Sequence, residues 1–340
     1  MSLNIAVVKN DTYQDLWVSN KTSDKLHVLK STLMRVSPIG LSDIFNTDYI
    51  IIKDTDEYPS NIAVKVEKIN TTTYSHKISS LQFLDETFHK DISLESVSLD
   101  VDSINWNNYN IVIAINMCIP KRVTGKYPKT LWCYYIGENN DSNVEYIVDG
   151  YDIILNQDIQ RQLLPYYSIG FPYTLLNSRS LSSLIGYSGN KHGVFMEINN
   201  TSERPVVTVP ESFQRIGTET TQSIIIHNQN IMINLQNLCA SKYFVKLFGR
   251  RIRGNAVMEA ISCGTLCLIN KSLLMYESLI QDSCNVSSET EIINKIHYFE
   301  THPEEYQKEL NEQRRRLDTT YFSEPIKALV REYQKKLELL

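Results

Sequence analysis

Short runs of apolar residues alternate along this chain with longer segments in which apolar residues recur every three or four positions. The short runs have the length of buried strands, and the longer segments have the period of helices that pack on one face. Parallel strands need a crossover connection, which is usually a helix, so this alternation is typical of parallel sheets covered by helices. The pattern therefore predicts the α/β fold class.

The predicted strands fall into two groups. The first group is Asn4 to Val8, Tyr49 to Ile52, Ile111 to Ile115, Leu131 to Ile136 and Tyr151 to Leu155. The second group is Gly193 to Ile198, Ser223 to Ile226, Tyr243 to Phe248 and Leu266 to Ile269. The helical period predicts helices at about Asn230 to Ala240, Gly254 to Ser262, Met275 to Ile280, Glu289 to Phe299 and His302 to Leu317, and a last helix that begins at Ser323.

The two groups of strands predict two domains. A stretch without clear periodicity, Pro172 to Lys191, separates the groups, and 340 residues are more than one hydrophobic core usually holds. We expect an N-terminal domain over residues 1–172 and a C-terminal domain over residues 190–322. The helix over residues 323–340 has one apolar face and should pack on a core.

Composition narrows the classes of function. The net charge of −5 gives no global basic field of the kind that attracts nucleic acid, so we expect no nucleic-acid partner. The six cysteines are spread out, which favours reduced, buried thiols over a disulfide framework or a zinc site. The start lacks the pattern of a signal peptide, and no apolar stretch is long enough to cross a bilayer. These features predict a cytoplasmic protein and leave peripheral membrane association open.

The segment from Ser241 to Asn270 carries the functional prediction. It predicts a strand, a polar loop, a helix, a tight glycine turn and a second strand. The helix would open near Gly254 and Asn255, where free backbone N–H groups and the positive end of the helix dipole suit a diphosphate. Arginine side chains in the loop add positive charge with a fork geometry that fits phosphate oxygens. These arginines are Arg250, Arg251 and Arg253.

Two more side chains extend the predicted site. Glu259 lies four residues after Asn255, on the same face of the helix, and its carboxylate can accept two hydrogen bonds from ribose hydroxyls. The opposite, buried face would be Ala256, Val257, Ala260 and Ile261. Gly264 would end the helix, because the position after a C-cap favours glycine. Lys246 either reaches the phosphates or extends its ammonium group to an exposed rim.

This segment resembles the donor half of nucleotide-sugar glycosyltransferases with two Rossmann-like domains, the GT-B fold. In that family a helix that reads Glu-Ala-x-x-x-Gly precedes an apolar strand, and here Glu259 to Gly264 precede Leu266 to Ile269. The resemblance implies that Glu259 holds the donor ribose and that the helix start near Gly254 and Asn255 holds the diphosphate. It also implies that His227, after a predicted strand of the second domain, contacts the base or the sugar.

The same resemblance implies an architecture and a reaction. Two Rossmann-like domains would face each other across a cleft, with the C-terminal helix returning to the first domain. A sugar would pass from a nucleotide-diphosphate donor to a hydroxyl acceptor, such as a glycan in polysaccharide biosynthesis. Many retaining relatives carry a second Glu eight residues before the ribose Glu, and Arg251 occupies that position here, so the stereochemical outcome stays open.

The incoming hydroxyl must lose a proton, and the base should come from the first domain, across the cleft from the donor. Glu138 follows a predicted strand and a glycine, and it is the favoured base. Asp11, after the first predicted strand, is the second candidate.

A metal ion is not expected. Asp54-Thr55-Asp56 and Asp100-Val101-Asp102 both match the Asp-x-Asp pattern that holds a divalent cation in other glycosyltransferases. A tripeptide of this kind also arises by chance in an acidic chain, and the helix dipole and basic side chains can do the work of the metal. We therefore expect the nucleotide sugar as a co-substrate and no cofactor.

Three other interpretations compete with this one. The first is a Rossmann-like half of an unrelated α/β protein, in which the arginines only solvate a loop. The second is a nucleotide-sugar epimerase of the same fold, which would need no acceptor. The third is a noncatalytic module that binds nucleotide without turnover.

Overall fold

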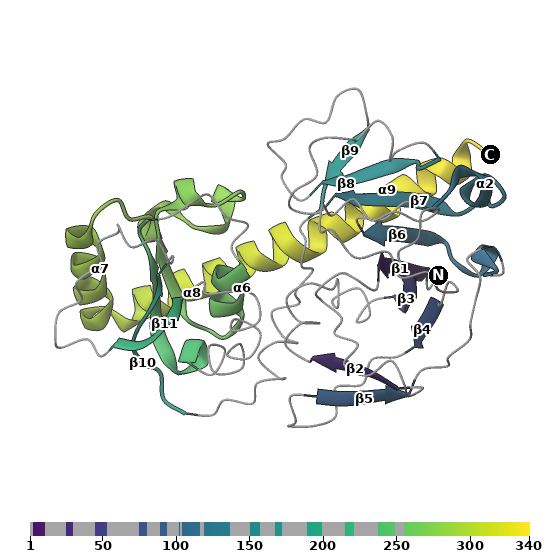
Figure 1. Ribbon diagram of the computed structural model, residues 1–340. Helices are drawn as coiled ribbons and strands as arrows, with labels where there is room; N and C mark the ends of the chain where they lie inside the picture. The colour runs from purple at the N-terminus through teal and green to yellow at the C-terminus, as the bar shows by residue number, and fades with distance from the viewer. Residues whose placement is uncertain are drawn as a thin grey trace. The chain divides into compact units, whose positions relative to one another are not determined.

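The computed structural model describes residues 3–10, 25–29, 45–52, 75–79, 89–93, 102, 104–115, 119–136, 150–156, 167–171, 189–198, 215–220, 237–248 and 255–340. The chain divides into two compact units (Figure 1). Unit 1 comprises Met1–Leu175 and Pro325–Leu340, and unit 2 comprises Leu176–Glu324. Each unit contains a mainly or wholly parallel sheet, so the prediction of an α/β protein with parallel sheets is confirmed.

The main sheet of unit 1 has the strand order β4-β3-β1-β6-β7-β8-β9 in the described part of the chain. Neighbouring strands are parallel, except that β4 is antiparallel to β3. The strands are β1 (Asn4–Asn10), β3 (Asn46–Ile52), β4 (Ser75–Ser79), β6 (Ile111–Ile115), β7 (Leu131–Ile136), β8 (Ile153–Asn156) and β9 (Ser168–Gly170). A separate antiparallel pair is formed by β2 (Lys25–Leu29) and β5 (His89–Ser93).

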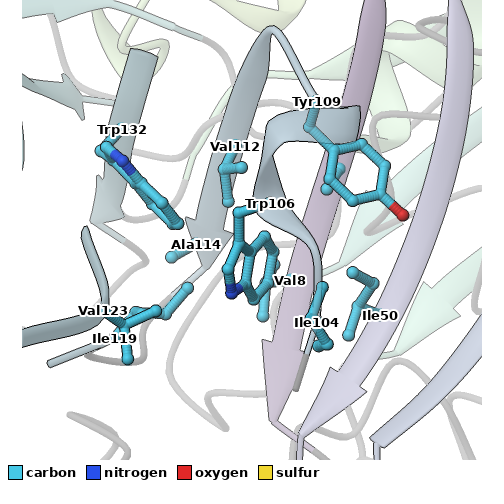
Figure 2. Close-up of a cluster of buried hydrophobic side chains, with 11 residues drawn as sticks. Val8, Ile50, Ile104, Trp106, Tyr109, Val112, Ala114, Ile119, Val123 and Trp132 are labelled. Atoms are coloured by element: carbon cyan, nitrogen blue, oxygen red, sulfur yellow. The ribbon is translucent and has the colours of Figure 1, made fainter. Parts of the chain in front are cut away.

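A cluster of buried apolar side chains covers one face of this sheet. Trp106, in the short 3-10 helix η3 (Trp106–Asn108), is fully buried among side chains of β1, β3, β6 and β7 (Figure 2). Its ring meets the ring of Trp132 edge to face, with 5.4 Å between the centroids, an arrangement that aromatic pairs prefer. Val123, on α2 (Lys121–Thr124), packs in the same cluster. All five residues of β6 are buried, which is typical of a sheet covered on both faces.

The sheet of unit 2 has the strand order β11-β10-β12-β13, and every neighbouring pair is parallel. The strands are β10 (His192–Ile198), β11 (Arg215–Thr220), β12 (Ser241–Lys246) and β13 (Leu266–Ile269). The sequence pattern does not predict β11, because its residues form no apolar run. The predicted strand Ser223 to Ile226 lies outside the described residues.

Helices of unit 2 lie between and after its strands. They are α6 (Asn255–Ser262), α7 (Glu289–Thr301) and α8 (Pro303–Asp318). At the start of α7, the Ser288 side chain accepts a hydrogen bond from Glu291 N, and the Glu291 carboxylate accepts one from Ser287 N. These two bonds satisfy backbone donors at the start of the helix, as in a capping box.

The predicted helix from Met275 to Ile280 is wrong. This region contains the 3-10 turns η4 (Lys271–Leu273), η5 (Glu277–Leu279) and η6 (Asp282–Cys284). The apolar spacing that suggested a helix instead comes from buried side chains in and beside η5, namely Tyr276, Leu279 and Ile280. After these turns the chain returns to β13, and Val286 N donates a hydrogen bond to Ile269 O at 3.1 Å.

Gln313 closes the outer edge of β13. Its side chain is fully buried on α8, and its amide oxygen accepts a hydrogen bond from Cys267 N at 2.9 Å. Its amide nitrogen donates to Cys267 O at 2.8 Å. A side-chain amide thus supplies the two backbone hydrogen bonds that a further strand would have made, and the edge strand is satisfied inside the protein.

The last helix, α9 (Glu324–Glu338), makes hydrogen bonds with the strands and loops of unit 1. Asn110 Nδ2 donates to Tyr333 Oη at 2.8 Å, and Tyr167 Oη donates to Glu332 at 2.8 Å. Lys336 Nζ donates to Thr130 O at 2.7 Å and pairs with Asp152 at 2.6 Å. Across the part of the chain that the structure describes, no helix is both long enough and apolar enough to span a membrane.

Candidate functional site

In the sheet of unit 2, successive strands of the chain are added first on one side of β10 and then on its other side. β10 pairs with β11 on one side and with β12 on the other, so the chain passes to the opposite side of β10 after β11. At such a switch point the connections leave the carboxyl ends of two neighbouring strands in opposite directions, and α/β proteins bind ligands in the crevice that this leaves. The segment between β12 and α6 follows one of these two carboxyl ends.

Lys246 is the last residue of β12 and lies at this edge. Its side chain is 1% exposed, and its backbone oxygen accepts a hydrogen bond from Asn270 N at 2.9 Å. The alternative with the ammonium group at an exposed rim is therefore wrong. A buried ammonium group is costly unless it interacts with polar or charged groups, so a lysine at this position is an unusual feature of the carboxyl edge of the sheet.

Helix α6 begins at Asn255 and is buried on all sides from Ala256 to Ser262. The residues of the predicted buried face are buried, but burial extends round the helix, because Met258, Glu259 and Ser262 are buried too. The reason is that α6 packs against both β13 and α8. The Glu259 side chain is 3% exposed, so its carboxylate lies inside the protein.

Gly264 ends α6 as the sequence predicts. Its φ of 78° is in the left-handed region, which glycine adopts without strain. Gly264 N donates to Ile261 O at 3.0 Å, and Thr265 N donates to Ala260 O at 2.9 Å, which is the Schellman pattern of a helix end. A Cβ atom here would also meet the guanidinium group of Arg314, from α8, but that flexible side chain can move aside, so it is the positive φ that favours glycine.

Most of the other predicted site residues lie outside the described residues, and for Asn255 only the backbone is described. Those outside are Asp11, Glu138, His227, Arg250, Arg251, Arg253 and Gly254. Their roles stay predictions.

Unit 1 has a switch point of its own. β1 pairs with β3 on one side and with β6 on the other. Asp11 is the residue that follows β1 in the sequence, whereas Glu138 follows β7, which is beyond β6 in the sheet. Strand order cannot be read directly from a single sequence, so the sequence alone could not rank the two candidates by their distance from this switch point.

Of the acidic residues in the two Asp-x-Asp tripeptides, the structure describes Asp102. Asp102 forms an ion pair with Arg122 and a second one, at 3.7 Å, with Lys126. The hydrogen bond from Arg122 lowers the pKa of Asp102, which keeps that carboxylate charged. Within the described residues, no group of three or more His, Cys, Asp or Glu side chains could hold a metal ion. Asp54, Asp56 and Asp100 lie outside them.

No family model matches the chain, and no curated protein does. Among solved structures, it is similar to T4 phage beta-glucosyltransferase, with 11% identity, a TM-score of 0.42, and 99% of this chain and 98% of that chain covered. Its structural neighbours are glycosyltransferases. One of them is T4 phage BGT in complex with UDP and Mn²⁺, with 10% identity, a TM-score of 0.41 and 99% of each chain covered. Another, T4 phage BGT in complex with UDP-glucose, has 11% identity, a TM-score of 0.40, and coverage of 99% and 97%. Similarity at this level assigns no residue of the chain.

Proposed function

We propose that this chain transfers a glycosyl unit from a nucleotide-diphosphate sugar to a hydroxyl acceptor. The observation that carries the proposal is the switch point of unit 2. There the segment that follows β12 leads into α6, and the last residue of β12, Lys246, and a residue of α6, Glu259, are both buried. A cation at the end of a strand and a carboxylate on the next helix match the two halves of a nucleoside diphosphate, its phosphates and its ribose.

Both positively and negatively charged groups of the protein would hold the donor. The start of α6 and the loop arginines Arg250, Arg251 and Arg253 face the diphosphate, and they stabilise the negative charge that develops as it leaves. Glu259 accepts hydrogen bonds from the ribose hydroxyls. Because this carboxylate is shielded from water, each such bond is stronger than it would be at the surface.

The acceptor would be held by the first of two Rossmann-like domains of the GT-B type, and a base there removes the proton of the attacking hydroxyl. The strand order supports Asp11 over Glu138 as this base, because Asp11 follows the strand at the switch point of unit 1. The helix over residues 323–340 would pack back on the first domain.

The acceptor class that we propose is a glycan, as in polysaccharide biosynthesis in the cytoplasm. The net charge of −5 supports a glycan over a nucleic acid, because a protein that binds DNA usually presents a basic surface to the phosphates. We also propose transfer without a metal ion, with arginine and lysine side chains neutralising the diphosphate.

A transfer assay tests this proposal. The purified chain is incubated with UDP-, GDP-, CDP- or dTDP-sugars and a panel of oligosaccharides, with and without EDTA. We expect nucleoside diphosphate to be released only when donor and oligosaccharide are both present, and the oligosaccharide to gain the mass of one sugar.

Other outcomes of the same assay identify the competing functions. A new sugar isomer formed without acceptor would indicate an epimerase, and binding of nucleotide without turnover would indicate a noncatalytic module. Transfer to double-stranded DNA instead of oligosaccharide would show that the proposed acceptor class is wrong. Loss of transfer in EDTA would overturn the metal-independent mechanism.

A further inference from the structure

Two thiols that are distant in the sequence meet at the amino edge of the unit 2 sheet. Cys239 lies in the helical turn at 237–240, directly before β12, and Cys263 follows α6 shortly before β13. Because β12 and β13 are parallel neighbours, the residues that precede them arrive at the same edge. The side chains of Cys239 and Cys263 are hydrogen-bonded to each other, and both cysteines are free and buried.

Other hydrogen bonds hold the two segments together independently of the thiols. The Thr265 hydroxyl lies 2.6 Å from Leu238 O and 2.9 Å from Ser241 O. Lys191 Nζ donates to Cys239 O at 2.5 Å and to Thr265 Oγ1 at 3.2 Å. The backbone on each side of the two sulfur atoms is therefore fixed, and the pair does not depend on a chance approach of two side chains.

The surroundings of Cys239 distinguish it from the other described cysteines. The hydrogen bond from the Cys263 thiol lowers the pKa of Cys239, and the charge of Lys191 lowers it further, against the effect of burial. Burial raises the pKa of Cys133 and Cys267, and it raises that of Cys284 to about 12. The thiolate is the form that reacts, and among the described cysteines Cys239 is the one whose surroundings lower its pKa.

We propose that Cys239 and Cys263 form an oxidation site at which hydrogen peroxide generates an intrachain disulfide. The Cys239 thiolate attacks one peroxide oxygen, the O–O bond breaks, and the departing hydroxide takes up a proton to leave as water. The sulfur atom of Cys263 then attacks the Cys239 sulfenic acid, an S–S bond forms, and hydroxide leaves with the Cys263 proton as a second water. The two thiols lose two electrons and two protons, and one peroxide becomes two waters.

The bond would form at the end of the helix that carries Glu259, since Cys263 N donates to Glu259 O at 2.8 Å. Any effect on nucleotide binding rests on the proposed function. Formation of the disulfide does not, and it is tested on its own.

Peptide mapping of the full-length protein tests the oxidation site. The reduced chain is treated with hydrogen peroxide, its remaining thiols are alkylated in denaturant, and it is digested without reductant for mass spectrometry. We expect a linked peptide pair that contains Cys239 and Cys263 and that dithiothreitol separates, while Cys267 and Cys284 stay alkylated and serve as internal controls. Recovery of Cys239 and Cys263 as alkylated thiols, or their linkage to other cysteines, would overturn the proposal.

Two variants test the order of the steps. In Cys263→Ser the second thiol is absent, so a sulfenic acid should accumulate at Cys239 and react with dimedone. In Cys239→Ser we expect no dimedone adduct at Cys263. An adduct at Cys263 in the second variant, with none at Cys239 in the first, would contradict the assignment of Cys239 as the attacking thiol.

Discussion

Replacement of Glu259 by glutamine is expected to weaken the binding of nucleoside diphosphates by roughly 10- to 150-fold. Glutamine has nearly the same shape, but it carries no charge and has only one acceptor oxygen for the two ribose hydroxyls. A hydrogen bond to a charged group contributes about 1.5–3 kcal/mol, and a tenfold change in affinity corresponds to about 1.4 kcal/mol. Isothermal titration calorimetry with the nucleotide that binds the wild type measures this loss.

Glu304→Gln is the matched control for this substitution. Glu304 is exposed in the first turn of α8, in the same unit, and its replacement removes the same charge. The control should bind nucleotide like the wild type. Circular dichroism of Glu259→Gln without ligand shows whether the variant folds, because Glu259 is buried. A folded Glu259→Gln variant with unchanged affinity would remove Glu259 from the donor site.

Replacement of the buried Gln313 by leucine is expected to cause a large loss of stability in unit 2. Leucine fills a similar volume but leaves both the N–H and the C=O group of Cys267 buried without their partner. Each unsatisfied buried group costs about 1–3 kcal/mol, so the free energy of unfolding should fall by about 2–6 kcal/mol. Urea denaturation followed by circular dichroism measures the change.

Gln307→Leu is the control on the same helix, because Gln307 is exposed and bonds only to a neighbouring side chain, Asn311. It should change stability by less than about 0.5 kcal/mol. Hydrogen exchange provides a second measurement: the Cys267 amide should exchange faster in Gln313→Leu than in the wild type. Equal stability of the two variants would show that the amide pair does not hold the edge of β13.

The strands that the sequence predicts best are those buried on both faces. β6 and β7 were predicted with the bounds that the structure has, because every residue in them is buried and the apolar run is therefore unbroken. β9 and β11 lie at the edges of their sheets, where fewer apolar side chains are needed, and neither has a run that a sequence pattern can detect.

The candidate site shows the same limit. The role of Gly264 could be predicted, since a helix commonly ends with a left-handed residue, and glycine adopts that conformation without strain. The burial of Glu259 and the pairing of Gln313 with β13 depend on α8, which is distant in the sequence, and no local pattern reports them. The contact between Cys239 and Cys263 depends on the parallel pairing of β12 with β13, so no local pattern in the sequence reports it.

The central claim is that the switch point of unit 2 binds a nucleoside diphosphate, and a thermal-shift screen tests it most directly. The chain is heated with UDP, GDP, CDP or dTDP, and with the matching monophosphates. A ligand that binds only the folded state stabilises it by about 2.7 kcal/mol at 100 times its Kd, so one diphosphate should raise the unfolding midpoint more than its monophosphate does. The shift should shrink in Glu259→Gln. If none of the four diphosphates raises the midpoint, the account is contradicted.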